Sequence, residues 1–185
     1  MFKKEVIPGP RSKVKSSVQR SLRTKFLETH PGFEPYIDEI MPKKSSLEAV
    51  KLPEKATLYT VDSQPVFFES MDNPIIPHLK VVHKYPNALP SIGIDRGAIR
   101  FVLSGAALMA PGLTSAGGRL PDPENIPEER ELNAGEVVAI TAEGKEEACM
   151  VGVLKVGTED IKMKAKGVVM DQSHYLGDGL WNIKL

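Results

Sequence analysis

GAIRFVLSGAALMAPG, residues 97–112, is the stretch that decides the fold of this chain. One charge, Arg100, interrupts a run of apolar and small residues that ends at Pro111 and Gly112. A helix that spans a membrane needs about 20 apolar residues. The run is too short for that, and it therefore belongs to the core of a soluble domain.

The same stretch predicts a short helix followed by a glycine turn. Asp95 can accept hydrogen bonds from the first backbone amides of a helix that starts near Gly97. Gly105 suits the left-handed position that ends such a helix. Arg100 points away from the apolar face that helical spacing predicts, which consists of Ile99, Val102, Leu103 and Ala106.

Runs rich in valine and isoleucine follow this helix. Residues 136–142, 148–156 and 167–171 are typical of strands, and AEGKEE, residues 142–147, is typical of a turn. We interpret LMAPGLTS, residues 108–115, as a strand interrupted by Pro-Gly. Short strands, glycine turns and one small helix predict a small β-barrel.

The first half of the chain has a mixed pattern. Residues 13–29 predict an amphipathic helix, because Val14, Val18, Leu22 and Phe26 recur at steps of four. A second, short helix is expected around residues 35–40, and a hairpin over residues 56–69. Residues 78–86 fit either a strand or a helix. We expect an α+β domain over residues 1–92 and a small β-barrel domain with a C-terminal extension over residues 93–185.

The charges are segregated, although the chain is formally neutral. Residues 1–25 carry a single acid, Glu5, against the basic residues Lys3, Lys4, Arg11, Lys13, Lys15, Arg20, Arg23 and Lys25. Acids dominate residues 121–147, where only Arg130 and Lys145 are basic. This asymmetry indicates an end that faces a polyanion and a separate solvated acidic segment. A helix with a solvated basic face is the simpler alternative.

No motif of an enzyme is present. The chain has no phosphate-binding loop, no GxSxG and no HExxH, and Asp171 and Asp178 have no recognisable nucleophile or base beside them. The single cysteine, Cys149, lies in an apolar run and predicts a buried, inert thiol. We expect no catalytic residue, no metal and no cofactor. MFKKEVIPGP lacks the apolar stretch of a secretory signal, so a reducing location, cytoplasmic or nuclear, is the default.

IDRGAIRFVLSGAALMAPGLTSAGG, residues 94–118, resembles the opening of a PUA domain, a small RNA-binding pseudo-barrel, and residues 135–140, 147–156 and 167–170 fit its later strands. The whole chain resembles the malignant T-cell amplified sequence protein family. The motifs that carry this wider resemblance are MFKK (1–4), GFEPYIDEIMPKK (32–44), LKVVHKYP (79–86), GAIRFVLSGA (97–106), PGLTS (111–115), AEGK (142–145) and HYLGDGLW (174–181).

The resemblance implies a translation factor without a covalent step, with an N-terminal α+β domain followed by a PUA domain. Such a factor binds the small ribosomal subunit and partners density-regulated protein, which carries a SUI1-type domain. It acts in re-initiation and in the handling of initiator or deacylated tRNA.

The RNA is expected to lie against the helix and the loop after it, because small residues let a nucleic acid approach main-chain amides and arginines supply charge. The expected RNA-binding residues are Arg96, Gly97, Arg100, Gly105, Ala106, Ala107, Pro111 and Gly112. Lys3, Lys4, Lys13, Lys15, Lys43 and Lys44 are further candidates for contact with ribosomal RNA or with a partner. A glycine-alanine turn that simply packs tightly is the alternative for the first set.

The sequence departs from the family pattern in two places. Residues 119–134 are longer and more acidic than the corresponding loop, and EVIPGPRS, residues 5–12, differs after the shared MFKK. Acid beside an RNA groove would repel phosphate, so we expect this loop to swing away, to contact protein or to tune the affinity for RNA. A protein-interaction adaptor and an RNA-modification accessory protein remain the alternative functions.

Overall fold

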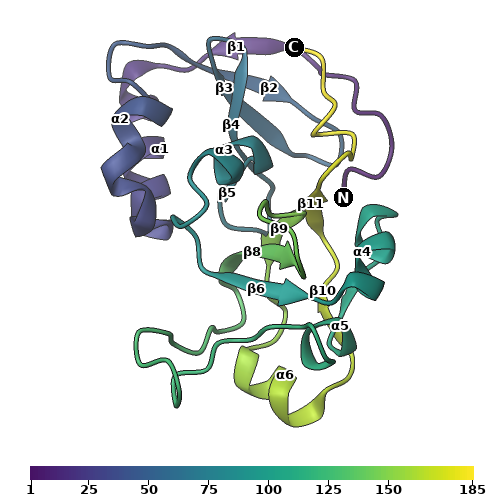
Figure 1. Ribbon diagram of the computed structural model, residues 1–185. Coiled ribbons are helices and arrows are strands. Elements are labelled where there is room, and N and C mark those ends of the chain that lie inside the picture. The colour runs from purple at the N-terminus through teal and green to yellow at the C-terminus, as the bar shows by residue number, and fades with distance from the viewer.

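The computed structural model describes all residues from 1 to 185. Its first half is built on an antiparallel sheet with the strand order β1-β2-β3-β4-β5 (Figure 1). The strands are β1 (Arg11–Lys13), β2 (Leu47–Lys51), β3 (Thr57–Val61), β4 (Gln64–Glu69) and β5 (Ile76–Pro77). The hairpin predicted over residues 56–69 is confirmed as β3 and β4. Its two-residue turn has positive φ at Asp62 and Ser63, the geometry that matches the twist of paired strands.

The helices of the first half are α1 (Ser16–Thr29), the 3-10 helix η1 (Pro31–Tyr36), α2 (Ile37–Ile40) and α3 (Leu79–Lys84). The helix predicted over residues 13–29 is confirmed from Ser16 onward, and Leu22 and Phe26 are buried as expected. Val18 was wrongly assigned to the core face, since it is 46% exposed. Residues 78–86, which fit either state, contain α3.

The second half carries a four-stranded sheet in the order β11-β9-β8-β6, in which β6 runs parallel to β8, and a separate pair β10-β7. The strands are β6 (Ser91–Ile94), β7 (Leu108–Met109), β8 (Val137–Ala142), β9 (Met150–Val153), β10 (Val168–Met170) and β11 (Ser173–Tyr175). All three predicted valine-rich strands are therefore present. The helices are α4 (Arg96–Leu103), α5 (Pro111–Thr114) and α6 (Thr158–Lys164).

Two expectations for this half were wrong. Residues 108–115 are not one interrupted strand, because the chain forms the two-residue β7 and then turns into α5, with Pro111 in its first turn. Proline is suited to that position because its missing N–H would have no helical partner there. Leu103 and Ala106 were assigned to the apolar face of α4, but Leu103 is 40% exposed and Ala106 is exposed beyond the end of the helix, whereas Val102 is buried. None of the helices combines the length and the apolar character that crossing a membrane requires.

The two halves share part of their core. One buried cluster fills the second half, but the cluster of the first half continues into β8 and β9 and includes the N-terminal Phe2. Figure 1 shows why: the N-terminus lies at the junction, and the chain after β11 runs back along the first sheet. The division at residues 92 and 93 remains a prediction, and the shared cluster implies that the halves are held together.

Polar groups are also buried at this junction. His174 and Asp178 have no exposed side-chain surface, and the Asp178 carboxylate accepts hydrogen bonds from His174 Nδ1 at 2.9 Å and from the amide of Trp181 at 2.8 Å. The His78 ring, from the first half, lies 4.5 Å from the His174 ring. Burial, and then the neighbouring His174, lowers the pKa of His78 well below its usual value.

Candidate nucleic-acid interface

Helix α4 is positioned by its N-terminal cap. Asp95 Oδ1 accepts a hydrogen bond from the amide of Ala98 at 2.9 Å, and Oδ2 accepts one from the Ser115 hydroxyl. The Ser115 hydroxyl, followed by the Ala98 amide, lowers the pKa of Asp95. The predicted cap is therefore confirmed, and it also ties α4 to the end of α5.

A groove of about 590 Å³ lies between α4 and the chain from residue 107 to residue 115. Gly97, Arg100, Ala107, Pro111 and Gly112, all predicted RNA-binding residues, line it. Gly112 lets the two walls approach closely, because a Cβ there would lie 3.1 Å from the Cβ of Ala98. The structure thus brings most of the predicted set together in one concave surface.

Arg96 lies elsewhere. Its amide donates to Glu143 Oε2 at 3.3 Å, and a Cβ added at Gly144 would lie 2.7 Å from Arg96 Nη2. The guanidinium is therefore drawn over the acidic turn of residues 143–147, away from the groove. Two carboxylates, those of Asp95 and Glu143, stand at the N-terminus of α4, where a phosphate would otherwise be favoured.

Gly105 and Ala106 also do not line the groove. Gly105 ends α4 at φ +82°, as predicted, but it is buried. A Cβ there would lie 2.8 Å from the Tyr175 hydroxyl and 2.9 Å from Lys3 Cγ. The absence of a side chain at Gly105 therefore lets the N-terminal segment and β11 pack against the end of α4.

Two exposed apolar residues of the groove were missed from the sequence. Phe101 is 54% exposed and Met109 is 44% exposed, although both belong to the run that we assigned to the core. The Arg100 guanidinium lies 4.8 Å from the centroid of the Phe101 ring. Helical spacing could have predicted the exposure of Phe101, since this residue does not lie on the helix face that contains Ile99 and Val102. Val168 of β10, 37% exposed, pairs with Met109 and extends the apolar surface.

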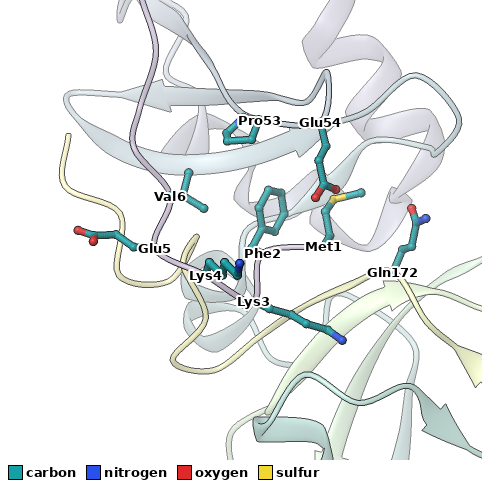
Figure 2. Close-up of a pocket in the computed structure, with 9 residues that line it drawn as sticks. All are labelled: Met1, Phe2, Lys3, Lys4, Glu5, Val6, Pro53, Glu54 and Gln172. Carbon is teal, nitrogen blue, oxygen red and sulfur yellow. The ribbon is translucent and has the colours of Figure 1, made fainter.

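The predicted lysines form two separate groups. Lys3 and Lys4 line a pocket of about 510 Å³ at the N-terminal segment, opposite Glu54 and Gln172. Figure 2 shows the Lys3 side chain extending toward the second half of the chain. Lys13, Lys43 and Lys44 line a different groove, along α1, and Lys15 is the exposed residue that precedes that helix.

Cys149, His174 and Asp178 lie inside the protein, whereas Asp171 is exposed and pairs with Lys155. Cys149 is buried as predicted, and burial raises the pKa of its thiol to about 11. Asp178 does have a base beside it, His174, contrary to the sequence-based expectation. Since the pair has no exposed surface and Asp178 also bonds backbone amides, it stabilises the residue 174–181 segment and cannot reach a substrate.

The acidic loop of residues 119–134 is folded onto its own half of the molecule. Ion pairs connect Arg119 to Glu129, Arg130 to Glu136, and Lys162 to Glu131. Figure 1 shows this loop on the side of the second half opposite α4. Its carboxylates therefore lie away from the groove.

Comparison with known proteins defines the class of this chain. A Pre-PUA-like domain matches residues 2–86, and a PUA domain matches residues 90–176. Among solved structures, a hypothetical protein of Pyrococcus horikoshii shares the fold with a TM-score of 0.71 at 17% identity, covering 93% of this chain and 98% of that one. A PUA-domain protein of Aeropyrum pernix has a TM-score of 0.67 at 24% identity, covering 95% and 90%. The protein is a PUA-domain protein with an α+β domain before the pseudo-barrel.

The particular family follows from curated relatives. Translation machinery-associated protein 20 of Saccharomyces cerevisiae is 49% identical over 95% of this chain and 93% of its own length. Malignant T-cell-amplified sequence 2 of Homo sapiens is 42% identical over 92% and 90%. The chain belongs to the family that these proteins form, as its resemblance indicated.

Proposed function

We propose that this protein is a non-enzymatic RNA-binding factor of the translation machinery. In this proposal it acts in the cytoplasm on the small ribosomal subunit, in re-initiation and in the handling of initiator or deacylated tRNA. Its partner is a density-regulated-type protein with a SUI1-type domain. The name of the yeast relative and the PUA domain support the role in translation, while the finer steps rest on the family resemblance.

The observation that carries the RNA-binding proposal is the groove along α4. Phe101 and Met109 offer an exposed apolar platform, and Arg100 supplies one cation at its edge. Aromatic side chains beside a cation are the usual means of holding unstacked bases. Gly97 lines the groove and is exposed, so no side chain covers the backbone of α4 there.

The acidic loop does not favour the adaptor alternative. Its acids were the sequence feature that supported an interaction with protein, but two of them, Glu129 and Glu131, are already paired with Arg119 and Lys162 of the same chain. We therefore keep the translation factor as the proposed function.

Fluorescence anisotropy with a labelled single-stranded RNA tests the groove. Arg100→Glu should weaken binding about tenfold or more, because it reverses the cation beside the base platform. Arg96→Glu makes the same change in charge on the same helix, outside the groove, and should leave the affinity within about twofold. Equal effects of the two variants would show that α4 acts only through general charge.

Sedimentation from native lysate tests the biological setting. We expect the protein to migrate with free small ribosomal subunits and to recover a SUI1-domain protein on affinity capture. The association should weaken as salt is raised, because phosphate contacts release counterions. Salt-insensitive capture of proteins without any RNA would reject the proposal in favour of the adaptor.

A further inference from the structure

A second groove, of about 930 Å³, lies on the first half of the molecule between α1 and the loop of residues 41–46. Its lining is basic and hydroxylic, and no carboxylate contributes to it. The cations are Lys13, Arg20, Arg23, Lys43 and Lys44. Lys13, Lys43 and Lys44 are candidate contacts from the sequence, whereas Arg20 and Arg23 were counted only in the basic N-terminal segment.

Most of this charge has no partner within the protein. Arg23 pairs with Asp38 at 2.5 Å, whereas no ion pair engages Lys13, Arg20, Lys43 or Lys44, all of which are exposed. Like charges gathered in one concavity repel each other and concentrate a positive potential. An anionic ligand would relieve that repulsion.

The groove is preformed. Gln19 of α1 holds the loop at two points: its Nε2 donates to the Ser45 carbonyl at 2.8 Å, and its Oε1 accepts from the Leu47 amide at 3.1 Å. Met41, at the start of the loop, is 1% exposed and anchors it in the core. Lys43 and Lys44 thus lie on a loop that is already held in place, so less conformational entropy is lost when a ligand binds.

The chemistry of the lining selects the occupant. Protein interfaces take most of their energy from Trp, Tyr and Arg anchors in well-packed pockets. The groove has no aromatic residue, one of its two arginines, Arg23, is already paired with Asp38, and its apolar members are partly or fully buried. Lysine, arginine, serine and threonine are the side chains that contact phosphate oxygens. Ser16 and Thr24 add hydroxyls to the cations.

We propose that this groove is a second RNA-binding surface, which holds a phosphate backbone without regard to base sequence. The inference rests on the proposed function to the extent that RNA is the ligand of the chain. Figure 1 shows α1 and α4 on opposite sides of the molecule. The two surfaces therefore engage different RNA segments, and one protein bridges them.

The test compares two double variants in the full chain. Lys43→Gln with Lys44→Gln removes two cations of the groove, and Lys51→Gln with Lys55→Gln removes two exposed, unpaired lysines at the far end of β2 and the turn after it. Affinity for a labelled 20-nucleotide single-stranded RNA is measured across a series of KCl concentrations. Thermal melts followed by circular dichroism check that both variants fold.

The expected result follows from counterion release. Each phosphate contact with a single strand contributes about 0.7 to the slope of log K against log salt, so the groove variant should lose about 1.4 in slope. At 0.1 M salt this corresponds to a loss of about 25-fold in affinity. The control variant should keep both values. An unchanged slope and affinity in the groove variant would overturn the proposal.

Three further measurements separate this proposal from the alternatives. If Arg100→Gln weakens RNA binding and the Lys43/Lys44 double variant does not, the α4 groove binds RNA and the proposal for the α1 groove is wrong. If only the Lys43/Lys44 double variant weakens binding, the α1 groove binds RNA and the α4 groove does not. Loss of binding to a polyglutamate peptide, with RNA binding intact, would identify an acidic protein as the occupant and overturn the proposal. Capture of a second labelled RNA on bead-bound RNA should require both surfaces.

Discussion

Phe2 should be one of the most important single residues for the junction between the two halves. It is 4% exposed, and its ring meets Phe68 of β4 at 5.4 Å and His174 of β11 at 6.4 Å, both edge to face. Its carbonyl accepts a hydrogen bond from the amide of Gly179 at 2.7 Å. The Phe2 ring therefore contacts both sheets. Phe2→Ala removes both ring contacts and leaves the backbone hydrogen bond in place.

The cost can be worked out from this burial. A phenylalanine buries about 150–250 Å², which at about 25 cal/mol per Å² sets an upper limit of about 4–6 kcal/mol. Truncation to alanine in cores costs about 3–5 kcal/mol. Because a chain end can shift to fill part of the cavity, we expect the low end, about 3 kcal/mol.

Urea denaturation of the full chain measures this loss. Far-ultraviolet circular dichroism reports both halves, and the fluorescence of Trp181, whose ring stacks 6.4 Å from His78, reports the junction. Both signals should move together to lower urea. Ile7→Ala, at a residue 77% exposed, is the control and should change the free energy of unfolding by less than about 0.5 kcal/mol. A loss below about 1 kcal/mol in Phe2→Ala would refute the reasoning.

Three further changes test the site and the core. Phe101→Ala should weaken single-stranded RNA binding about 5- to 150-fold, from about 1–3 kcal/mol per stacked base, without changing the salt slope in anisotropy titrations; equal loss in the exposed control Leu103→Ala would contradict it. Burial lowers the pKa of His30 to about 4, so the folded protein resists protonation of this ring while the unfolded chain does not. The free energy of unfolding should therefore fall by about 3 kcal/mol as the pH drops from 6.5 to 4. In urea titrations, His30→Gln should lack this part of the pH dependence, and a pH profile identical to that of the wild type would exclude the role of His30. Gly105→Ala should lower the free energy of unfolding, measured with urea, by about 2–4 kcal/mol, because the new Cβ is strained at positive φ and collides with Tyr175 and Lys3. Gly135→Ala should cost less, because φ is +89° there but no atom lies near the new Cβ. Equal costs would exclude the collision.

Local signals in the sequence were sufficient for much of the fold. The cap at Asp95, the left-handed end of α4 at Gly105 and the hairpin of residues 56–69 all depend on a few adjacent residues. The resemblance supplied the order of the two domains. Helix α6 was not predicted, although Glu159 and Asp160 in its first turn and lysines in its last turn have the arrangement that a helix dipole favours.

The contents of the candidate site depended on contacts between distant segments. Arg96 and Arg100 are equivalent in the sequence, but Glu143, far along the chain, stands beside the first and not the second. Arg20 joined the basic groove only because Gln19 holds the loop of residues 41–46 against α1. Spacing along one helix cannot show which partner a distant loop brings, so these residues could be assigned only from the structure.

The two surfaces differ in a way that divides the work of binding. The α4 groove has Arg100 as its one cation, an exposed aromatic ring, and carboxylates at the helix N-terminus. The α1 groove has four unpaired cations and no exposed ring. Because counterion release scales with the number of cations that meet phosphate, the α1 groove should set the salt dependence of RNA binding. Stacking does not release counterions, so the α4 groove should set the preference for unpaired bases.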